Sequence, residues 1–147
     1  MMRTIPLAAL LFCSFASVAP ADAPLEGTKP AQWRVVWMDD PSTKATILWS
    51  TAKQGQYHSV QYHVKGDDQE PAEQLARTGQ YTGGKTELFY HQVQLTDLEP
   101  ATAYEIKLIS DKNESAAFYF VTAPVLDREF SILHGGDSRS DRETRRE

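Results

Sequence analysis

The chain has 147 residues with a formal net charge of −5 at pH 7, and 41% of its residues are hydrophobic. This length favours a single domain. The acidic balance disfavours nucleic acid or an anionic membrane surface as a partner, because such partners require a basic footprint. The one cysteine, Cys13, excludes a fold held together by internal disulfide bonds.

Residues 1–21 have the pattern of a cleavable export signal. A positive charge at Arg3 precedes a short apolar run, Ile5–Val18, and the small residues Ala19-Pro20-Ala21 follow it. The run is too short for a stable membrane anchor, which needs about 20 apolar residues. Cleavage near Ala21 therefore predicts a secreted or periplasmic protein that lacks cysteine altogether.

The chain after this signal predicts a linker and then an antiparallel β-sandwich. Residues 22–32 contain several prolines and alanines and read as the linker. Over residues 33–124, short runs alternate apolar and polar side chains between turn residues, with no helical period. Strands are expected at Trp33–Met38, Lys44–Thr51, Tyr57–Lys65, Glu73–Tyr81 (a weakly patterned edge strand), Glu87–Thr96, Thr102–Ser110 and Ser115–Thr122. About seven short strands are typical of the immunoglobulin or fibronectin type III fold.

The bulkiest candidates for the core of this sandwich are Trp33, Trp37 and Trp49. Trp49 shares one face of its expected strand with Ala45 and Ile47, because side chains alternate between the two faces of a strand.

Three histidines are scattered over the expected strands. None of His58, His63 and His91 has a histidine or cysteine partner at the spacing of metal ligands. We therefore expect His63 on a solvated face and His91 in or near the core, without a metal role.

The segment Leu98–Tyr104 fits a tyrosine corner, a feature of β-sandwiches. Pro100 would make the crossover between the sheets rigid, and the Tyr104 hydroxyl would bond back to the upstream backbone. The predicted role of both residues is structural.

Residues 125–147 have a different pattern. A short apolar run ends in Gly135-Gly136, Asp137 follows at once, and Ser140 with Glu143 forms a capping box that starts a helix. This order places Asp137 beyond the carboxyl end of a strand, where parallel α/β sheets bind ligands. The segment therefore reads as the start of a second, incomplete domain.

Asp137 and Arg139 are the candidate site residues of this loop. A metal-dependent phosphoester hydrolase needs hard oxygen ligands in an open position, and the Asp137 carboxylate is one. Arg139 could meet a phosphate with two parallel hydrogen bonds. The alternative is an ordinary aspartate in a turn.

Three blocks in this order resemble the amino-terminal domain of purple acid phosphatases: Thr46–Thr51, His91–Tyr104 and Phe118–Pro124. That domain has a fibronectin type III-like fold and precedes a calcineurin-like metallophosphoesterase domain. Phe130–Asp137 resembles the first strand and first metal motif of that second domain. Among the three blocks of the sandwich, His91–Tyr104 is the most specific.

This resemblance implies that Asp137 binds one metal of a dinuclear centre, iron paired with zinc, manganese or iron, which hydrolyses a phosphate-ester substrate. Arg139 departs from the family, whose members often carry glycine or histidine at that position, and the later ligand motifs are absent from this chain. The 147-residue chain by itself is therefore expected to bind no metal and to be inactive. The substrate, the metal pair and any homo-oligomer remain open.

Two functions are consistent with these features. In the first, the chain is the amino-terminal part of an exported phosphoesterase, and the sandwich is an accessory domain that packs beside the catalytic domain. The alternative is a free-standing fibronectin-type module that binds carbohydrate or protein, or a structural spacer, without catalysis.

Overall fold

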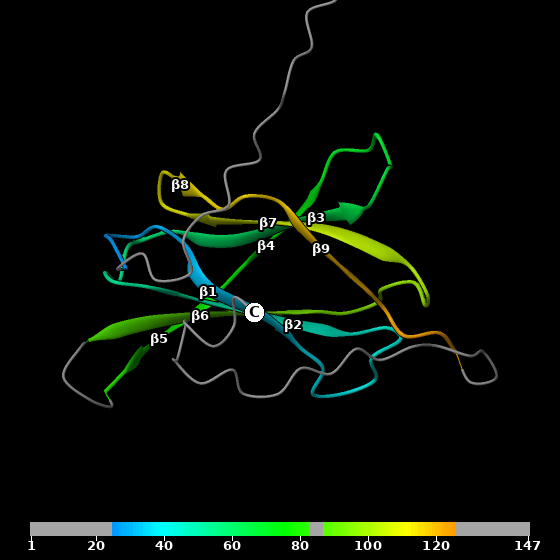
Figure 1. Cartoon of the computed structure of the whole chain (residues 1–147), viewed down its shortest axis with the longest axis horizontal. Helices are drawn as coiled ribbons and strands as arrows, with labels where there is room; N and C mark the ends of the chain where they lie inside the picture. The colour runs from blue at the N-terminus through cyan, green and yellow to red at the C-terminus, as the bar shows by residue number, and fades with distance from the viewer. Residues whose placement is uncertain (1–24, 83–86, 126–147) are drawn as a thin grey trace, which may run out of the picture.

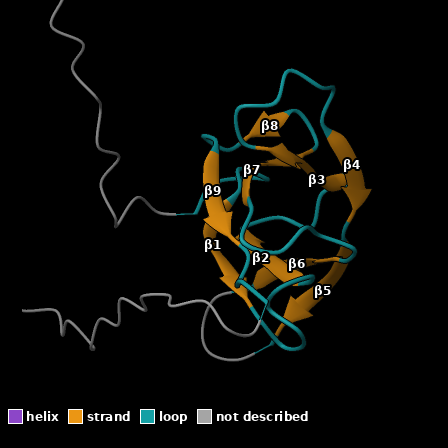
Figure 2. Cartoon of the chain, turned by 90° about the vertical axis from the view of Figure 1, so that its right-hand side faces the viewer, coloured by secondary structure: helices purple, strands orange, loops and turns teal. Residues whose placement is uncertain are grey.

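The computed structural model describes residues 25–82 and 87–125. These residues form an antiparallel β-sandwich of two sheets (Figures 1 and 2), and they contain no helix, so none that could span a membrane. The four-stranded sheet has the order β1 (Ala31–Val36), β2 (Ala45–Thr51), β6 (Leu88–Leu95), β5 (Arg77–Tyr81). The five-stranded sheet has the order β4 (Ala72–Leu75), β3 (His58–Val64), β7 (Ala103–Ser110), β8 (Asn113–Glu114), and β9 (Phe118–Val121) also pairs with β7. The expected all-β sandwich is confirmed.

The core lies between the central strands of the two sheets. Ile47 and Trp49 of β2 are 0% exposed, and on β6 Val93 lies opposite Ile47. From the other sheet, β3 and β7 contribute Val60 and Leu108, which are also paired and buried. The period-two alternation of the sequence therefore produces an interior in which aliphatic side chains surround the Trp49 ring.

The segment expected as one edge strand, Glu73–Tyr81, is instead two strands in different sheets. β4 pairs with β3 in the five-stranded sheet, and β5 pairs with β6 in the four-stranded sheet. Ala76 makes the crossing, and its N–H donates to the His58 carbonyl at 2.9 Å. The expectation was wrong because both strands lie at sheet edges and are largely exposed, so their weak alternation does not mark the change of sheet.

The first and the last of the expected strands have different bounds in the structure. β1 begins at Ala31, two residues before the predicted Trp33, with an irregular register between Ala31 and Arg34. Gln32 within this irregularity has a φ of 51°. The last expected strand, Ser115–Thr122, is shorter and follows the small hairpin strand β8.

Two of the three tryptophans predicted for the core are not in it. Trp49 is 0% exposed, but Trp33 on β1 and Trp37 directly after that strand are 48% and 46% exposed. The reason is that β1 is an edge strand of the four-stranded sheet, so its inward side chains meet the edge of the opposite sheet. Figure 2 shows β1 and β9 side by side on this flank.

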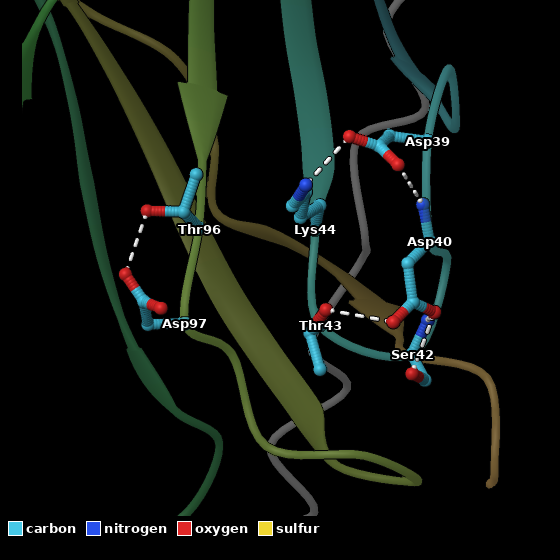
Figure 3. A network of polar contacts seen from close by, with 7 residues as sticks. All are labelled: Asp39, Asp40, Ser42, Thr43, Lys44, Thr96 and Asp97. Carbon is cyan, nitrogen blue, oxygen red and sulfur yellow. Dashed lines mark hydrogen bonds and ion pairs between the residues drawn. The ribbon is translucent and has the colours of Figure 1, made fainter.

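The turn between β1 and β2 closes one end of the sandwich through its own side chains (Figure 3). The Asp40 carboxylate accepts hydrogen bonds from the Ser42 N–H at 2.9 Å, the Ser42 hydroxyl at 2.7 Å and the Thr43 hydroxyl at 3.0 Å. Lys44 pairs with Asp39 at 2.6 Å. The two bonds from Ser42, and secondly the bond from Thr43, lower the pKa of the Asp40 carboxyl below its usual range.

Candidate functional site

Asp137 and Arg139, the predicted metal ligand and phosphate contact, lie outside the described residues. Within residues 25–82 and 87–125, no group of three or more histidine, cysteine, aspartate or glutamate side chains could hold a metal ion. The described sandwich offers a tyrosine corner, a buried histidine pair, an exposed aromatic seam and a shallow hollow.

The corner has the geometry that the sequence predicts. The Tyr104 hydroxyl accepts a hydrogen bond from the Glu99 N–H at 2.8 Å, directly before Pro100. The Thr122 hydroxyl donates to the Glu99 carbonyl at 2.6 Å and accepts from the Thr102 N–H at 2.9 Å. These bonds satisfy the backbone where the chain crosses between sheets, which is a structural role.

At the opposite end of β3 and β7, two histidine rings stack inside the sandwich. The rings of His58 on β3 and His91 on β6 lie 3.7 Å apart at 22°. On one side of the pair, the Ser110 hydroxyl is 2.9 Å from His58 Nδ1 and accepts from Trp49 Nε1 at 3.0 Å. His58 Nε2 is 2.6 Å from the Gln54 carbonyl, which can only accept, so this nitrogen carries the proton.

The His91 ring also has a hydrogen-bond partner at each of its two nitrogens. The Thr51 hydroxyl donates to the Lys53 carbonyl at 2.6 Å, so it accepts from His91 Nε2 at 2.9 Å. The Thr78 hydroxyl lies 2.9 Å from His91 Nδ1 and donates to it. In the neutral form of each ring, the network therefore places the proton on Nε2.

The surroundings of the pair oppose a positive charge on it. Burial, and secondly the charge of His58, lower the pKa of His91 from 6.5 to about 4, against an opposing effect of Asp111. The N–H groups of Gln56 and Tyr57 bond to Asp111 at 2.8 and 2.9 Å and lower the pKa of that carboxyl below its usual range. A neutral His91 ring and an ionised Asp111 are therefore the stable combination.

Gly55 allows the loop before β3 to close over the pair. It has a φ of +65°, and a Cβ there would lie 2.7 Å from both His58 Nε2 and Asp111 Oδ2. Only glycine meets both requirements without displacing the ring or the carboxylate.

The expectation that the histidines are scattered was wrong for this pair, although its His91 assignment to the core was right. The usable signal was strand phase, because His58 alternates in step with buried Val60 and His91 with buried Val93. His63, which is half-buried, lies 3.9 Å from Glu105 and takes no part in the network.

Aromatic side chains line the flank between the two edge strands. Trp33 stacks on Phe118 with ring centroids 4.0 Å apart, and Trp37 meets Phe120 edge-on at 6.4 Å. We call these four side chains the aromatic seam. Since both tryptophans remain about half exposed, the seam closes the sandwich and also presents apolar surface to its surroundings.

Further apolar residues next to the seam in the sequence are exposed. Met38 is 76% exposed, Tyr119 58%, Val121 50% and Val125 64%. Lys65 lies 3.6 Å from the centroid of the Tyr119 ring. An exposed apolar surface such as the aromatic seam is typical of a surface that contacts another protein segment.

A shallow hollow of about 270 Å³ lies on the outer face of the four-stranded sheet, with Arg34, Ser50, Tyr81 and Tyr90 in its lining. Tyr90 lies across Gly79, where a Cβ would come within 2.3 Å of the ring. The lining combines aromatic faces with hydrogen-bond donors.

The comparisons with solved structures place the chain among β-sandwich proteins. It is 15% identical to astrotactin-2, a vertebrate-specific, perforin-like membrane protein, with a TM-score of 0.52 over 78% of this chain and 26% of that chain. It is 15% identical to the fn3 domain of human contactin 1, with a TM-score of 0.47 over 84% of this chain and 96% of the other. A redesigned beta sandwich protein is 20% identical, with a TM-score of 0.47 over 66% of this chain and 96% of that chain. At such identities the similarity to astrotactin-2 supports the fold alone.

The fold and its tyrosine corner define a fibronectin type III-like sandwich. No curated protein matches the chain significantly. The family described as "Purple acid Phosphatase, N-terminal domain" matches residues 30–122. The chain belongs to this family, and its described strands fall within the matched range.

Proposed function

We propose that this chain is the amino-terminal part of an exported metallophosphoesterase of the purple acid phosphatase type, and that its sandwich is an accessory domain. The match of residues 30–122 to the N-terminal domain of that family carries the proposal. The lack of a metal-binding group among the described residues supports an accessory role for the sandwich rather than a catalytic one.

The aromatic seam is the surface through which the sandwich would pack against a catalytic domain. Val125, at the end of the second described stretch, follows β9 closely and is itself exposed. Half-exposed tryptophans are suited to such packing, since each buries a large apolar area at a small entropic cost.

Asp137 and Arg139 would serve the catalytic site. Asp137 would supply one carboxylate ligand, and Arg139 would orient the phosphate of the substrate. The dinuclear centre, iron with zinc, manganese or iron, would supply a metal-bound nucleophile and neutralise the phosphoryl charge. One carboxylate is too few ligands for a transition metal, so the 147-residue chain would neither retain metal nor hydrolyse phosphate esters.

The reading frame downstream of Glu147 gives the first test, because further metal-ligand motifs there are expected if the proposal is right. In the protein encoded by the longer frame, Asp137→Ala should remove bound metal and most turnover of p-nitrophenyl phosphate. Asp68→Ala, in an exposed loop, is the matched control and should leave both unchanged. Near-normal metal content and turnover in Asp137→Ala would refute the assignment. Sequencing of the secreted protein should find a new amino terminus near Asp22 if residues 1–21 are an export signal.

The hollow on the four-stranded sheet favours the second candidate, a free-standing binding module. Tyr81 and Tyr90 offer ring faces, and Arg34 and Ser50 offer donors, a combination that suits a carbohydrate. A stop codon directly after Glu147, with a stable secreted product, would favour this function over the first. Loss of glycan-array binding in Tyr90→Ala, with Tyr119→Ala as the control, would then locate the site.

A further inference from the structure

The stacked histidine rings are a direct contact between the two sheets. His58 belongs to the five-stranded sheet and His91 to the four-stranded sheet, and their rings lie 3.7 Å apart. The bond from Trp49 to Ser110 joins the same two sheets beside them. We propose that the His58–His91 pair is an acid-sensitive latch between the sheets, which holds this end of the sandwich closed when the His91 ring is neutral and loosens it when that ring gains a proton.

The hydrogen-bond network explains why a proton is poorly accommodated. In each neutral ring, Nδ1 accepts from a hydroxyl; in a protonated ring, Nδ1 becomes a donor and that hydroxyl must turn its own proton elsewhere. Ser110, the partner of His58, is 0% exposed, and its oxygen already accepts from Trp49. Among the described residues no buried side-chain polar atom lacks a partner.

Thr78, the exposed partner of His91, reduces the cost of protonating that ring only in part. Thr78 can turn its hydroxyl to water, but the His91 ring itself is 0% exposed and would carry its charge without solvent. Two protonated rings at this separation would also repel each other strongly. The pair therefore tolerates at most one proton, and that one at the expense of folding free energy.

Charged side chains lie on several of the elements that surround the pair. Asp111, in the turn after β7, is the carboxylate that attracts a proton to the pair. Glu73 on β4 bonds to Tyr57 at the edge of the five-stranded sheet, away from the rings. The side chains of Lys53, after β2, and Arg77 on β5 are exposed. Asp111 thus moderates the acid sensitivity but does not remove it.

The sign of the effect follows from the two states of His91. Its pKa falls from 6.5 in the unfolded chain to about 4 in the folded one, so the stabilisation is complete above the unfolded value and is lost as the pH falls toward about 4. Between about pH 7.5 and about pH 5, this group alone should reduce the folding equilibrium constant about 30-fold. The carboxylates with lowered pKa titrate below this window, so they do not obscure it.

The test is urea unfolding of the whole 147-residue chain at both ends of that pH window. The wild type should lose stability toward acid, and His91→Gln should flatten this dependence, because glutamine cannot take up the proton. His63→Gln is the matched control on the same strand as His58, and its pH dependence should equal that of the wild type. A wild type whose stability does not change in this window, or a control as flat as His91→Gln, would overturn the proposal.

If a histidine variant fails to fold, NMR titration of the wild-type imidazoles decides the question. A His91 ring that titrates well below its usual pKa supports the latch, and one that titrates at about 6.5 refutes it. Amide exchange, corrected for intrinsic rates, locates the loosening. Protection should fall at Thr51 and Ser110 in mild acid while it persists at Tyr104, and a uniform loss would contradict a local latch.

Discussion

The two ends of the sandwich are closed in different ways. At the corner end, the Tyr104 hydroxyl bonds to a backbone group only five residues away in the chain. At the histidine end, the bond from Trp49 to Ser110 joins residues 61 positions apart, and that from His91 to Thr51 joins residues 40 apart. The tyrosine of the corner end thus bonds locally, although Thr122 adds a bond to Glu99 from 23 positions away, whereas the histidine end depends on contacts between distant residues and on titratable rings. The local tyrosine bond can be recognised in the sequence and is insensitive to mild acid. The closure of the histidine end cannot be recognised in the sequence and is sensitive to mild acid.

Removing Trp49 should have the largest effect, because it takes away both the core ring and a bond between the sheets. Trp49→Ala should lower the free energy of unfolding by about 3–5 kcal/mol, since the ring is completely buried. Trp33→Ala, which removes a half-exposed ring stacked on Phe118, should cost about 1 kcal/mol. Urea denaturation of both variants measures the difference. Similar losses would show that the seam contributes as much to stability as the core.

A methyl group at Gly55 should disturb the histidine end next most strongly. Gly55→Ala places a Cβ against His58 and Asp111 at a positive φ, and it should cost about 2 kcal/mol. Gly66→Ala is the matched control, because Gly66 also has a positive φ, +87°, but nothing lies within 4 Å of its Cβ position. Its expected cost is about 1 kcal/mol from backbone strain alone. Thermal or urea unfolding compares the two, and equal losses would mean that crowding of the pair is unimportant.

The corner end should show the smallest change. Tyr104→Phe removes only the hydroxyl that bonds to the Glu99 N–H, and it should lower the unfolding free energy by about 1 kcal/mol. Tyr119→Phe, at an exposed position on β9, should change it by less than about 0.5 kcal/mol. The loss in Tyr104→Phe should be the same at neutral pH and in mild acid, unlike that of the histidine variants. A pH-dependent loss would show that the two ends are energetically linked.

Several features of the molecule could be predicted from the sequence because they depend on short segments. Alternation of side chains marked the strands and placed Trp49 inside, and the spacing of Pro100 and Tyr104 identified the corner. Both signals arise within a few residues, where backbone geometry dictates which side chains share a face or reach a nearby N–H.

Other features were decided only by the way the strands assemble. Alternation shows which face of a strand a side chain takes, but it does not show whether that strand is central or at an edge, or what lies opposite it. For this reason Trp33 and Trp37 were wrongly placed in the core, and the change of sheet at Ala76 was missed. For the same reason His58 and His91, which occupy inward positions on strands of different sheets, became a stacked pair only when the two sheets packed face to face.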